Sequence, residues 1–224
     1  MSDRIRESVI DLGRAVARAG LVVAAGGNIA ARMGDDQLWV TPQGWSLADL
    51  SEAALVRVSL EGDCLEGSNP PTSELLIHLA AMRARCDVAW SVHLHPPMAT
   101  LLHALDIQIH TITTDHAFYL RSIATVPYLH PGSEQLADAA AEELAAGADV
   151  VLLRHHGCLV VADTPDLALS RAVNLEAAAT ATYRARLLGD DAIACPPEFL
   201  DHVRGEEARG RGYGLRSAQG DAQG

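Results

Sequence analysis

The chain has 224 residues, a formal net charge of −12 and 49% hydrophobic residues. A chain of this length can build one domain around a sizeable core, and the composition excludes bulk disorder. Binding to a nucleic acid backbone or to an anionic membrane surface is disfavoured, because both need clustered positive charge.

Apolar residues recur with helical spacing in some segments and alternate with polar residues in others, and glycine and proline turns separate the segments. In the first half of the chain they predict a helix at 4–19, a hairpin of strands at 29–33 and 37–41, a second hairpin that turns at 61–63, and a helix that starts at 70–74 and runs to about 85. A strand at 88–95 and a short helix follow. The second half has a predicted strand near 124–128, a helix at 133–146, strands at 150–153 and 158–161, and a helix at 165–188. We expect a loosely structured tail after Pro196. Because hairpins join several strands, this order indicates one α/β domain with a mixed sheet.

The cellular compartment is predicted from what the sequence lacks. No apolar run approaches the roughly 18 residues of a membrane span. The first residues carry charges where a signal peptide needs an apolar segment. The four cysteines, at positions 64, 86, 158 and 195, form no close pair. We therefore expect a cytoplasmic protein with free thiols in a reducing environment.

Two histidines, His93 and His95, are separated by one residue on the strand predicted at 88–95. Residues i and i+2 of a strand point to the same side about 6.6–6.8 Å apart, so both imidazoles can reach one cation at about 2.0–2.1 Å. Pro96 and Pro97 place the pair at a strand end, where a site can open to solvent. The alternative, which the motif alone favours, is a pair of strand histidines hydrogen-bonded to the backbone.

His155 and His156 follow the strand predicted at 150–153. Since neighbouring strand residues point to opposite faces, we expect only one of the two to join the first pair. Gly157 permits a bend that would swing His156 outward. The alternative interpretation is a polar strand end.

Glu74 lies in the first turn of a predicted helix, where the helix dipole favours a carboxylate. It is either an ordinary N-terminal glutamate that completes a cap, or a metal ligand or general acid/base. His78 lies one turn later and could bind a metal together with Glu74, although a core or surface position is the preferred interpretation.

Three segments offer hydroxyls, an amide or free backbone N–H groups to an anion, namely Gly26-Gly27-Asn28, Thr41-Pro42-Gln43-Gly44 and Thr72-Ser73. None is a P-loop, because no lysine follows the glycines. Each of them alone is also explained as a loop with capping residues.

Six ordered blocks carry a resemblance to a known family. They are GGN (26–28), TPQG (41–44), PTSE (71–74), HLH (93–95), LLRHHG (152–157) and YGLR (213–216), and the resemblance covers roughly residues 5–216. In this order and spacing the chain resembles the class II aldolase/adducin family, and within it the L-fuculose-1-phosphate aldolases. The resemblance implies a three-layer αβα sandwich with a mixed, mostly antiparallel central sheet over residues 1–200, a tail at 201–224, and a homotetramer with active sites between subunits.

The resemblance also assigns roles to individual residues. One divalent metal per subunit, usually zinc with manganese or cobalt as alternatives, is implied to be held by Glu74, His93, His95 and His156. Glu74 would also act as the acid/base. Three neutral imidazoles with an open position describe a catalytic zinc site. The residues implied to surround the substrate phosphate are Asn28, Thr41, Gly44, Thr72 and Ser73, and the residue implied to assist at the aldehyde side, from the adjacent subunit, is Tyr213.

The implied reaction cleaves a ketose 1-phosphate, of the fuculose 1-phosphate or 5-deoxypentulose 1-phosphate type, to dihydroxyacetone phosphate and a short aldehyde. A metal-dependent decarboxylase and a pentulose-phosphate 4-epimerase are alternatives on the same fold, because the same metal site serves those reactions. A non-enzymatic scaffold like adducin is opposed by the intact set of metal ligands.

One departure from the family pattern concerns the aldehyde side. The family has a second tyrosine near Thr111, and threonine cannot replace a phenol in acid/base work. Asp115, His116 or Tyr119 could take its place, and a structural loop explains this stretch equally well. A smaller departure is Ala30, where the family often has serine.

Overall fold

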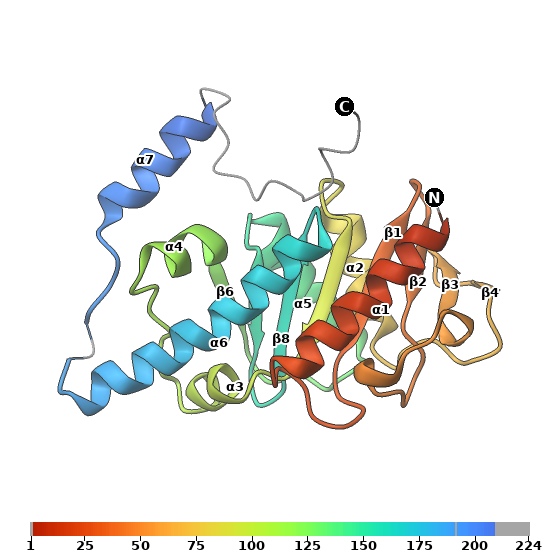
Figure 1. Cartoon of the computed structure of the whole chain (residues 1–224), viewed down its shortest axis with the longest axis horizontal. Helices are drawn as coiled ribbons and strands as arrows, with labels where there is room; N and C mark the ends of the chain where they lie inside the picture. Colours follow the sequence, from red (N-terminus) through yellow and green to blue (C-terminus); the bar gives the residue numbers. More distant parts are fainter. Residues whose placement is uncertain (1, 191, 209–224) are drawn as a thin grey trace, which may run out of the picture.

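The computed structural model describes residues 2–190 and 192–208. Within these residues, eight strands form one sheet with the spatial order β4-β3-β2-β1-β5-β8-β7-β6 (Figure 1). All neighbouring strands pair antiparallel except β6 and β7, which are parallel. The strands are β1 (Asn28–Met33), β2 (Gln37–Val40), β3 (Val56–Ser59), β4 (Cys64–Glu66), β5 (Trp90–Leu94), β6 (Ile123–Val126), β7 (Val150–Leu153) and β8 (Gly157–Ala162).

Helices cover both faces of this sheet, so the domain has three layers (Figure 1). The helices are α1 (Ser2–Arg18), α2 (Leu75–Ala84), α3 (Pro97–Ala104), α4 (Thr114–Leu120), α5 (Glu134–Ala145), α6 (Pro165–Leu187) and α7 (Pro197–Ala208), with 3-10 turns η1 (Leu47–Asp49) and η2 (Glu52–Ala54). Apolar side chains of α1, α3, α4 and α6 share one core with the sheet, and those of α2 and α5 share a second core on its other face. The predicted αβα sandwich with a mostly antiparallel sheet is confirmed. No helix in the described residues is both long and apolar enough to cross a bilayer.

The first helix illustrates how apolar spacing sets this arrangement. Val9, Leu12 and Val16 are buried in the first core, because residues three and four apart share one face of a helix. Gly20 follows the helix with φ of +72°, a left-handed conformation that glycine adopts without a Cβ clash. The predicted end of the helix is therefore close to the observed one.

The central strand β5 lies between β1 and β8 and is buried along its whole length. Trp90, Val92 and Leu94 pack into the core that contains α1 and α6. Because side chains alternate along a strand, Ser91 and His93 point to the opposite face, toward α2. The predicted alternation of this segment is confirmed, and it delivers polar side chains to the middle of the sheet.

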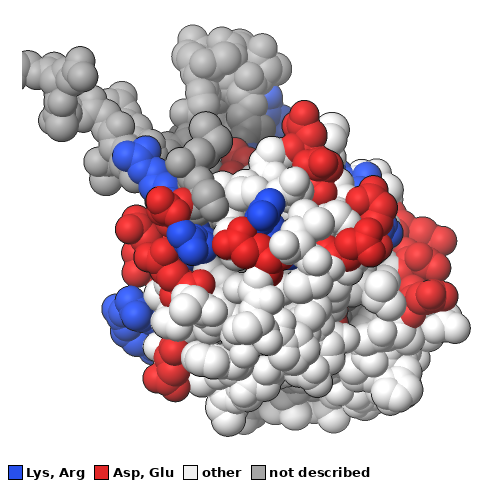
Figure 2. Space-filling model, turned by 90° about the vertical axis from the view of Figure 1, so that its right-hand side faces the viewer, with Lys and Arg blue, Asp and Glu red and all other residues white. Residues whose placement is uncertain are grey.

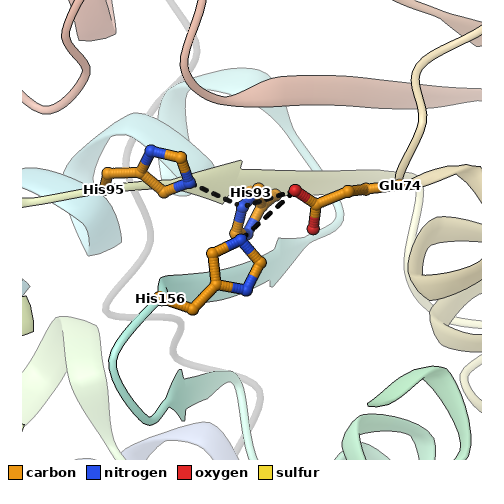
Figure 3. A group of neighbouring side chains, drawn as sticks. All are labelled: Glu74, His93, His95 and His156. Carbon is orange, nitrogen blue, oxygen red and sulfur yellow. Dashed lines mark hydrogen bonds and ion pairs between the residues drawn. The ribbon is translucent and has the colours of Figure 1, made fainter. Parts of the chain in front are cut away.

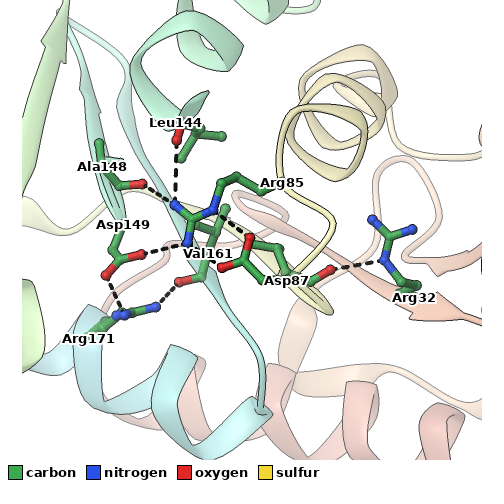
Figure 4. A network of polar contacts seen from close by, with 9 residues as sticks. Arg32, Arg85, Asp87, Leu144, Ala148, Asp149, Val161 and Arg171 are labelled. Atoms are coloured by element: carbon green, nitrogen blue, oxygen red, sulfur yellow. Dashed lines mark hydrogen bonds and ion pairs between the residues drawn. The ribbon is translucent and has the colours of Figure 1, made fainter. Parts of the chain in front are cut away.

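A polar network, buried at Asp149 and Arg171, ties the layers together where β7 begins (Figure 4). The carboxylate of Asp149 accepts a hydrogen bond from Arg171 of α6 at 2.5 Å and lies 3.4 Å from a guanidinium nitrogen of Arg85, which follows α2. Arg85 also donates to the carboxylate of Asp87 and to the carbonyl of Ala148. Because the buried charges are paired, their loss of hydration is compensated, and the network joins α2, β7 and α6.

Two helices depart from the sequence-based expectation. No helix is predicted at the position of α4, which forms because Thr113 and His116 make a capping box: the Thr113 hydroxyl accepts from the His116 backbone N–H, and His116 Nδ1 accepts from the Thr113 N–H. Glutamate or glutamine usually fills the place of His116. The prediction of a loose tail after Pro196 is wrong over α7, whose first residue, Pro197, is a common helix-start signal.

Candidate metal centre

Four predicted ligands meet where β5 ends (Figure 3). Glu74 immediately precedes α2, His93 and His95 lie on and just after the end of β5, and His156 lies in the turn between β7 and β8. One potential ligand atom of each residue lies within 4.8 Å of those of the other three. The structure therefore brings together the three imidazoles and the carboxylate to which the sequence points.

The separations of these atoms suit a single divalent ion. His93 Nε2 lies 2.9 Å from His95 Nε2 and 3.5 Å from Glu74 Oε1. Glu74 Oε1 lies 3.2 Å from His156 Nε2. Ligand atoms at about 2.0–2.1 Å from a tetrahedral ion are about 3.3 Å apart. The four side chains therefore need only small shifts to surround one ion.

The hydrogen bond on the far side of the His93 ring fixes which nitrogen faces the cluster. His93 Nδ1 lies 2.9 Å from the Cys158 carbonyl oxygen and donates to it. The proton is therefore on Nδ1, and the lone pair of Nε2 points at the other ligands, the arrangement typical of metal-binding histidines. Burial lowers the pKa of His93 to about 3, and burial also lowers the pKa of His95. Both rings are neutral at neutral pH, as metal ligation requires.

Glu74 contributes an ionised carboxylate with spare bonding capacity. Burial by itself would raise the pKa of this group, but the hydrogen bond with His156 and the attraction of the neighbouring imidazoles lower it to about 2. Glu74 occupies the N-cap position of α2, yet its side chain makes no capping hydrogen bond. In the described part of the chain, Glu74 Oε2 and His156 Nδ1 are buried without a hydrogen-bond partner. An orphaned carboxylate oxygen fits a metal site better than a helix cap.

Two glycines allow backbone to approach His95 closely. A Cβ on Gly157 would lie 2.2 Å from the Leu94 carbonyl oxygen and 2.6 Å from His95 Cδ2, and a Cβ on Gly26 would lie 2.9 Å from His95 Nδ1. The expected bend does not come from Gly157 but from His155, whose φ is +56°. His155 is exposed, so only His156 joins the cluster, as the sequence predicts.

The predicted anion-binding segments lie side by side. Pro42 and Pro71 form an isolated β-bridge, and the Thr72 N–H donates to the Thr41 carbonyl at 3.0 Å. The Thr41 hydroxyl accepts from the Ile29 N–H at 3.1 Å, which places this loop next to the start of β1. The structure therefore brings the predicted phosphate set together, with Asn28, Thr41 and Thr72 buried and Gly44 and Ser73 exposed.

His78 does not join the metal cluster. It is completely buried beneath the sheet, where its Nδ1 lies 2.8 Å from Ser91 Oγ and its Nε2 lies 2.6 Å from Asn28 Oδ1. Burial lowers the pKa of His78 to about 4. The preferred sequence interpretation, a core position, is correct, but the sequence does not indicate these two partners.

The residues considered for the aldehyde side lie on and before α4, and none of them belongs to the metal cluster. His116 is buried and caps α4, while Asp115 is exposed and Tyr119 is partly buried. The Thr111 carbonyl accepts a hydrogen bond from the Cys195 N–H at 2.7 Å. Tyr213 lies outside the described residues, so its predicted role is taken up below as a proposal.

The fold and the cluster define an αβα domain with a group of three histidines and one carboxylate that could hold a metal ion. Residues 7–183 match the family described as Class II Aldolase and Adducin N-terminal domain. The 5-deoxy-D-ribulose 1-phosphate aldolase of Bacillus thuringiensis serovar kurstaki is 30% identical over 210 residues, which cover 93% of this chain and 96% of that protein. The 3-oxo-tetronate 4-phosphate decarboxylase of Haemophilus influenzae is 31% identical over 160 residues, which cover 69% and 75%. A solved L-fuculose 1-phosphate aldolase matches with a TM-score of 0.83 and 23% identity, over 92% of this chain and 98% of that one.

The chain belongs to the Class II Aldolase and Adducin N-terminal domain family. The resemblance stated from the sequence is confirmed, and at the level of the family so is the prediction of an enzyme of the aldehyde-lyase type. Relatives of similar identity carry the names of an aldolase and of a decarboxylase. The family therefore includes relatives named for both kinds of reaction.

Acid is expected to destabilise the metal-free protein. The folded-state pKa values of His93 and His78, about 3 and about 4, lie below the value of about 6.5 in an unfolded chain. Below pH ~6.5 the unfolded state binds protons that the folded state does not, so the free energy of unfolding should fall by up to about 1.4 kcal/mol per pH unit for each histidine. Urea denaturation between about pH 7.5 and 5 measures this effect. A midpoint independent of pH over that range would contradict the neutral, buried state of these rings.

Proposed function

We propose that the protein is a divalent-metal-dependent aldolase that cleaves a ketose 1-phosphate of the fuculose 1-phosphate or 5-deoxypentulose 1-phosphate type. The products are dihydroxyacetone phosphate and a short aldehyde. The observation that carries the proposal is the convergence of three imidazoles and a carboxylate beside paired loops that offer hydroxyl and N–H donors. The 5-deoxy-D-ribulose 1-phosphate aldolase with 30% identity over 93% of this chain supports the substrate class.

The proposed reaction breaks the C3–C4 bond of the ketose once the C4 hydroxyl has lost its proton. His93, His95, His156 and Glu74 would hold a divalent ion, which would supply electrostatic stabilisation of the negative charge that develops on the substrate oxygens. The carboxylate of Glu74, ionised at neutral pH, would accept the proton that the C4 hydroxyl loses and then, in its protonated form, return a proton to C3 to complete dihydroxyacetone phosphate. Its buried and unpartnered Oε2 supports this role.

The phosphate group is proposed to bind between the start of β1 and the two paired loops, to Asn28, Thr41, Gly44, Thr72 and Ser73. Residues 26–28, 41–44 and 71–73 include no lysine or arginine, so neutral hydrogen-bond donors would hold the anion. Figure 2 shows that charged side chains on this side of the molecule lie mainly in its upper half and at its edges, and that the lower centre is mostly uncharged; the loop after α1 lies at the lower end in Figure 1. Binding would therefore depend on the orientation of individual N–H and O–H groups.

The remaining features of the proposal follow from the resemblance to the fuculose enzymes. Zinc is the proposed ion, with manganese or cobalt as alternatives, because imidazole and carboxylate accept several first-row ions. The proposed assembly is a cytoplasmic homotetramer with active sites between subunits and no nucleic acid or membrane partner. In it, residues 1–200 form the domain, and Tyr213 of the 201–224 tail assists at the aldehyde side of the adjacent subunit.

A decarboxylase is the second candidate, and two observations favour it. One relative with 31% identity is named 3-oxo-tetronate 4-phosphate decarboxylase. Thr111 stands where the aldolases have a tyrosine, which weakens the case for handling an aldehyde. A pentulose-phosphate 4-epimerase remains the third possibility on this fold.

Substrate turnover by the zinc-loaded protein decides among these functions. We expect dihydroxyacetone phosphate from 5-deoxyribulose 1-phosphate or fuculose 1-phosphate, loss of this activity after chelation, and its return with zinc. The free ketose should show a kcat/KM at least about 100-fold lower, because several charge-assisted hydrogen bonds to phosphate are lost. Carbon dioxide from 3-oxo-tetronate 4-phosphate, without any dihydroxyacetone phosphate from the ketose phosphates, would favour the decarboxylase. Unchanged turnover in metal-free protein would overturn both functions.

A further inference from the structure

A buried side-chain relay lies next to the metal cluster, and two of its three residues, Ser91 and His78, have no part in the chemistry described above. It runs from Ser91 of β5 through His78 of α2 to Asn28 at the start of β1. His78 has no exposed surface, and its two ring nitrogens lie 2.8 Å from Ser91 Oγ and 2.6 Å from Asn28 Oδ1. Three elements that are distant in the sequence thus converge on one imidazole.

The direction of each hydrogen bond in the relay follows from its chemistry. Asn28 Oδ1 can only accept, so the proton of the neutral His78 ring must lie on Nε2. His78 Nδ1 then carries a lone pair, and the Ser91 hydroxyl donates to it. Both ring nitrogens of His78 are hydrogen-bonded in this arrangement and in no other one that keeps Asn28 Oδ1 toward His78.

The relay determines what Asn28 presents to its surroundings. An amide side chain has two nearly equal shapes related by rotation, one presenting oxygen and the other presenting the NH₂ group. Because His78 holds Oδ1, the NH₂ group faces the other way, and it makes no hydrogen bond to any described residue. Asn28 pairs directly with the metal-site residue His93 in the sheet, and its neighbour Ile29 binds the hydroxyl of Thr41. The unpaired NH₂ group therefore lies between the metal cluster and the proposed phosphate loops.

We propose that His78, oriented by Ser91, is a positioning residue that fixes the amide of Asn28 so that it presents a hydrogen-bond donor to the substrate. The pocket then selects an acceptor, such as a phosphate oxygen, at this point and rejects a donor. The inference rests on the proposed function in one respect, namely that the substrate is phosphorylated. The orientation of the relay itself does not depend on that function.

Phosphate binding by zinc-loaded variants is the first test, with inorganic phosphate as the probe in titration calorimetry. His78→Phe should weaken phosphate binding by about 10–100-fold, the loss expected for one hydrogen bond to a charged group. Ser91→Ala removes only the hydroxyl and should cause a smaller loss in the same direction. In both variants the KM for the ketose 1-phosphate should rise more than kcat falls, and the zinc content should match that of the wild type. His103→Phe, which removes a different buried histidine located in α3, controls for unspecific damage to the core.

The first test overturns the proposal if the His78→Phe and Ser91→Ala proteins bind phosphate as the wild type does. An equal loss in His103→Phe would also overturn it. A wild-type protein that does not bind phosphate would instead count against the proposed function.

The tautomer of His78 is the second test, and it does not depend on activity. Long-range ¹H–¹⁵N correlation spectra of the wild-type protein should show the Nε2–H tautomer at His78. Ser91→Ala should allow the Nδ1–H form to appear, because the donor that opposes it is gone. If the wild-type ring were protonated on Nδ1, Nε2 would be an acceptor, and Asn28 would have to face it with its NH₂ group and not with Oδ1. That result would overturn the proposal for any substrate.

Discussion

Replacing His156 with asparagine is expected to abolish metal binding and to lower kcat/KM by at least roughly a thousandfold. The substitution removes one of three imidazole ligands and leaves the carboxylate of Glu74, which lies 3.2 Å from His156 Nε2, without that partner. A bound ion stabilises the charge in the transition state by several kcal/mol, and each 1.36 kcal/mol is a factor of ten in rate. Metal content measured by atomic emission, together with steady-state kinetics, tests this expectation.

The neighbouring residue provides a matched control. His155 has the same chemistry but is exposed and does not belong to the cluster, so His155→Asn should keep both the metal and the activity. If His156→Asn retained a full complement of zinc, or if the two variants lost activity equally, the assignment of His156 as a ligand would be wrong.

Replacing Glu74 with glutamine is expected to have the second large effect, a loss of kcat. The amide has the same shape but cannot accept and return a proton, so kcat should fall by about 10²–10⁴-fold, the range for loss of a general acid/base. Metal should remain bound through His93, His95 and His156, although more weakly. The exchange of a C–H proton of dihydroxyacetone phosphate with D₂O, followed by NMR, reports proton transfer directly, and it should become undetectable.

Glu134 offers the comparison for this experiment, since it also lies at the start of a helix but is exposed on α5. Glu134→Gln should leave kcat and the exchange rate unchanged. If Glu74→Gln lowered activity only through loss of metal, and excess zinc restored it, Glu74 would be a ligand without a role in proton transfer.

The local part of the metal site could be predicted from the sequence. His93 and His95 share a face because β5 alternates strictly, and Trp90, Val92 and Leu94 on the other face identify the strand. An alternation of apolar and polar residues depends only on residues close together in the sequence, so it can be recognised without knowledge of the tertiary contacts.

The parts of the site that depend on long-range contacts could not be predicted. Asn28 and His78 are 50 residues apart, and no local pattern indicates that β1 and α2 meet. The left-handed residue before β8 is His155, while Gly157 is needed for a different, long-range reason, because a Cβ there would lie 2.2 Å from the Leu94 carbonyl oxygen. The helix α4 could not be predicted for a different reason. Its capping box is formed by residues close together in the sequence, but it uses a histidine where the usual pattern has glutamate or glutamine.

The position of β5 between β1 and β8 has a consequence for biosynthesis. The ligands are gathered only when a late strand docks beside a strand that emerged more than 60 residues earlier. A nascent chain that ends before β8 therefore lacks a coordination sphere, and the ion can enter only after most of the polypeptide has left the ribosome. Metal binding should consequently occur only after the domain has folded. Translation products that end before β8 should bind zinc no better than an unstructured peptide.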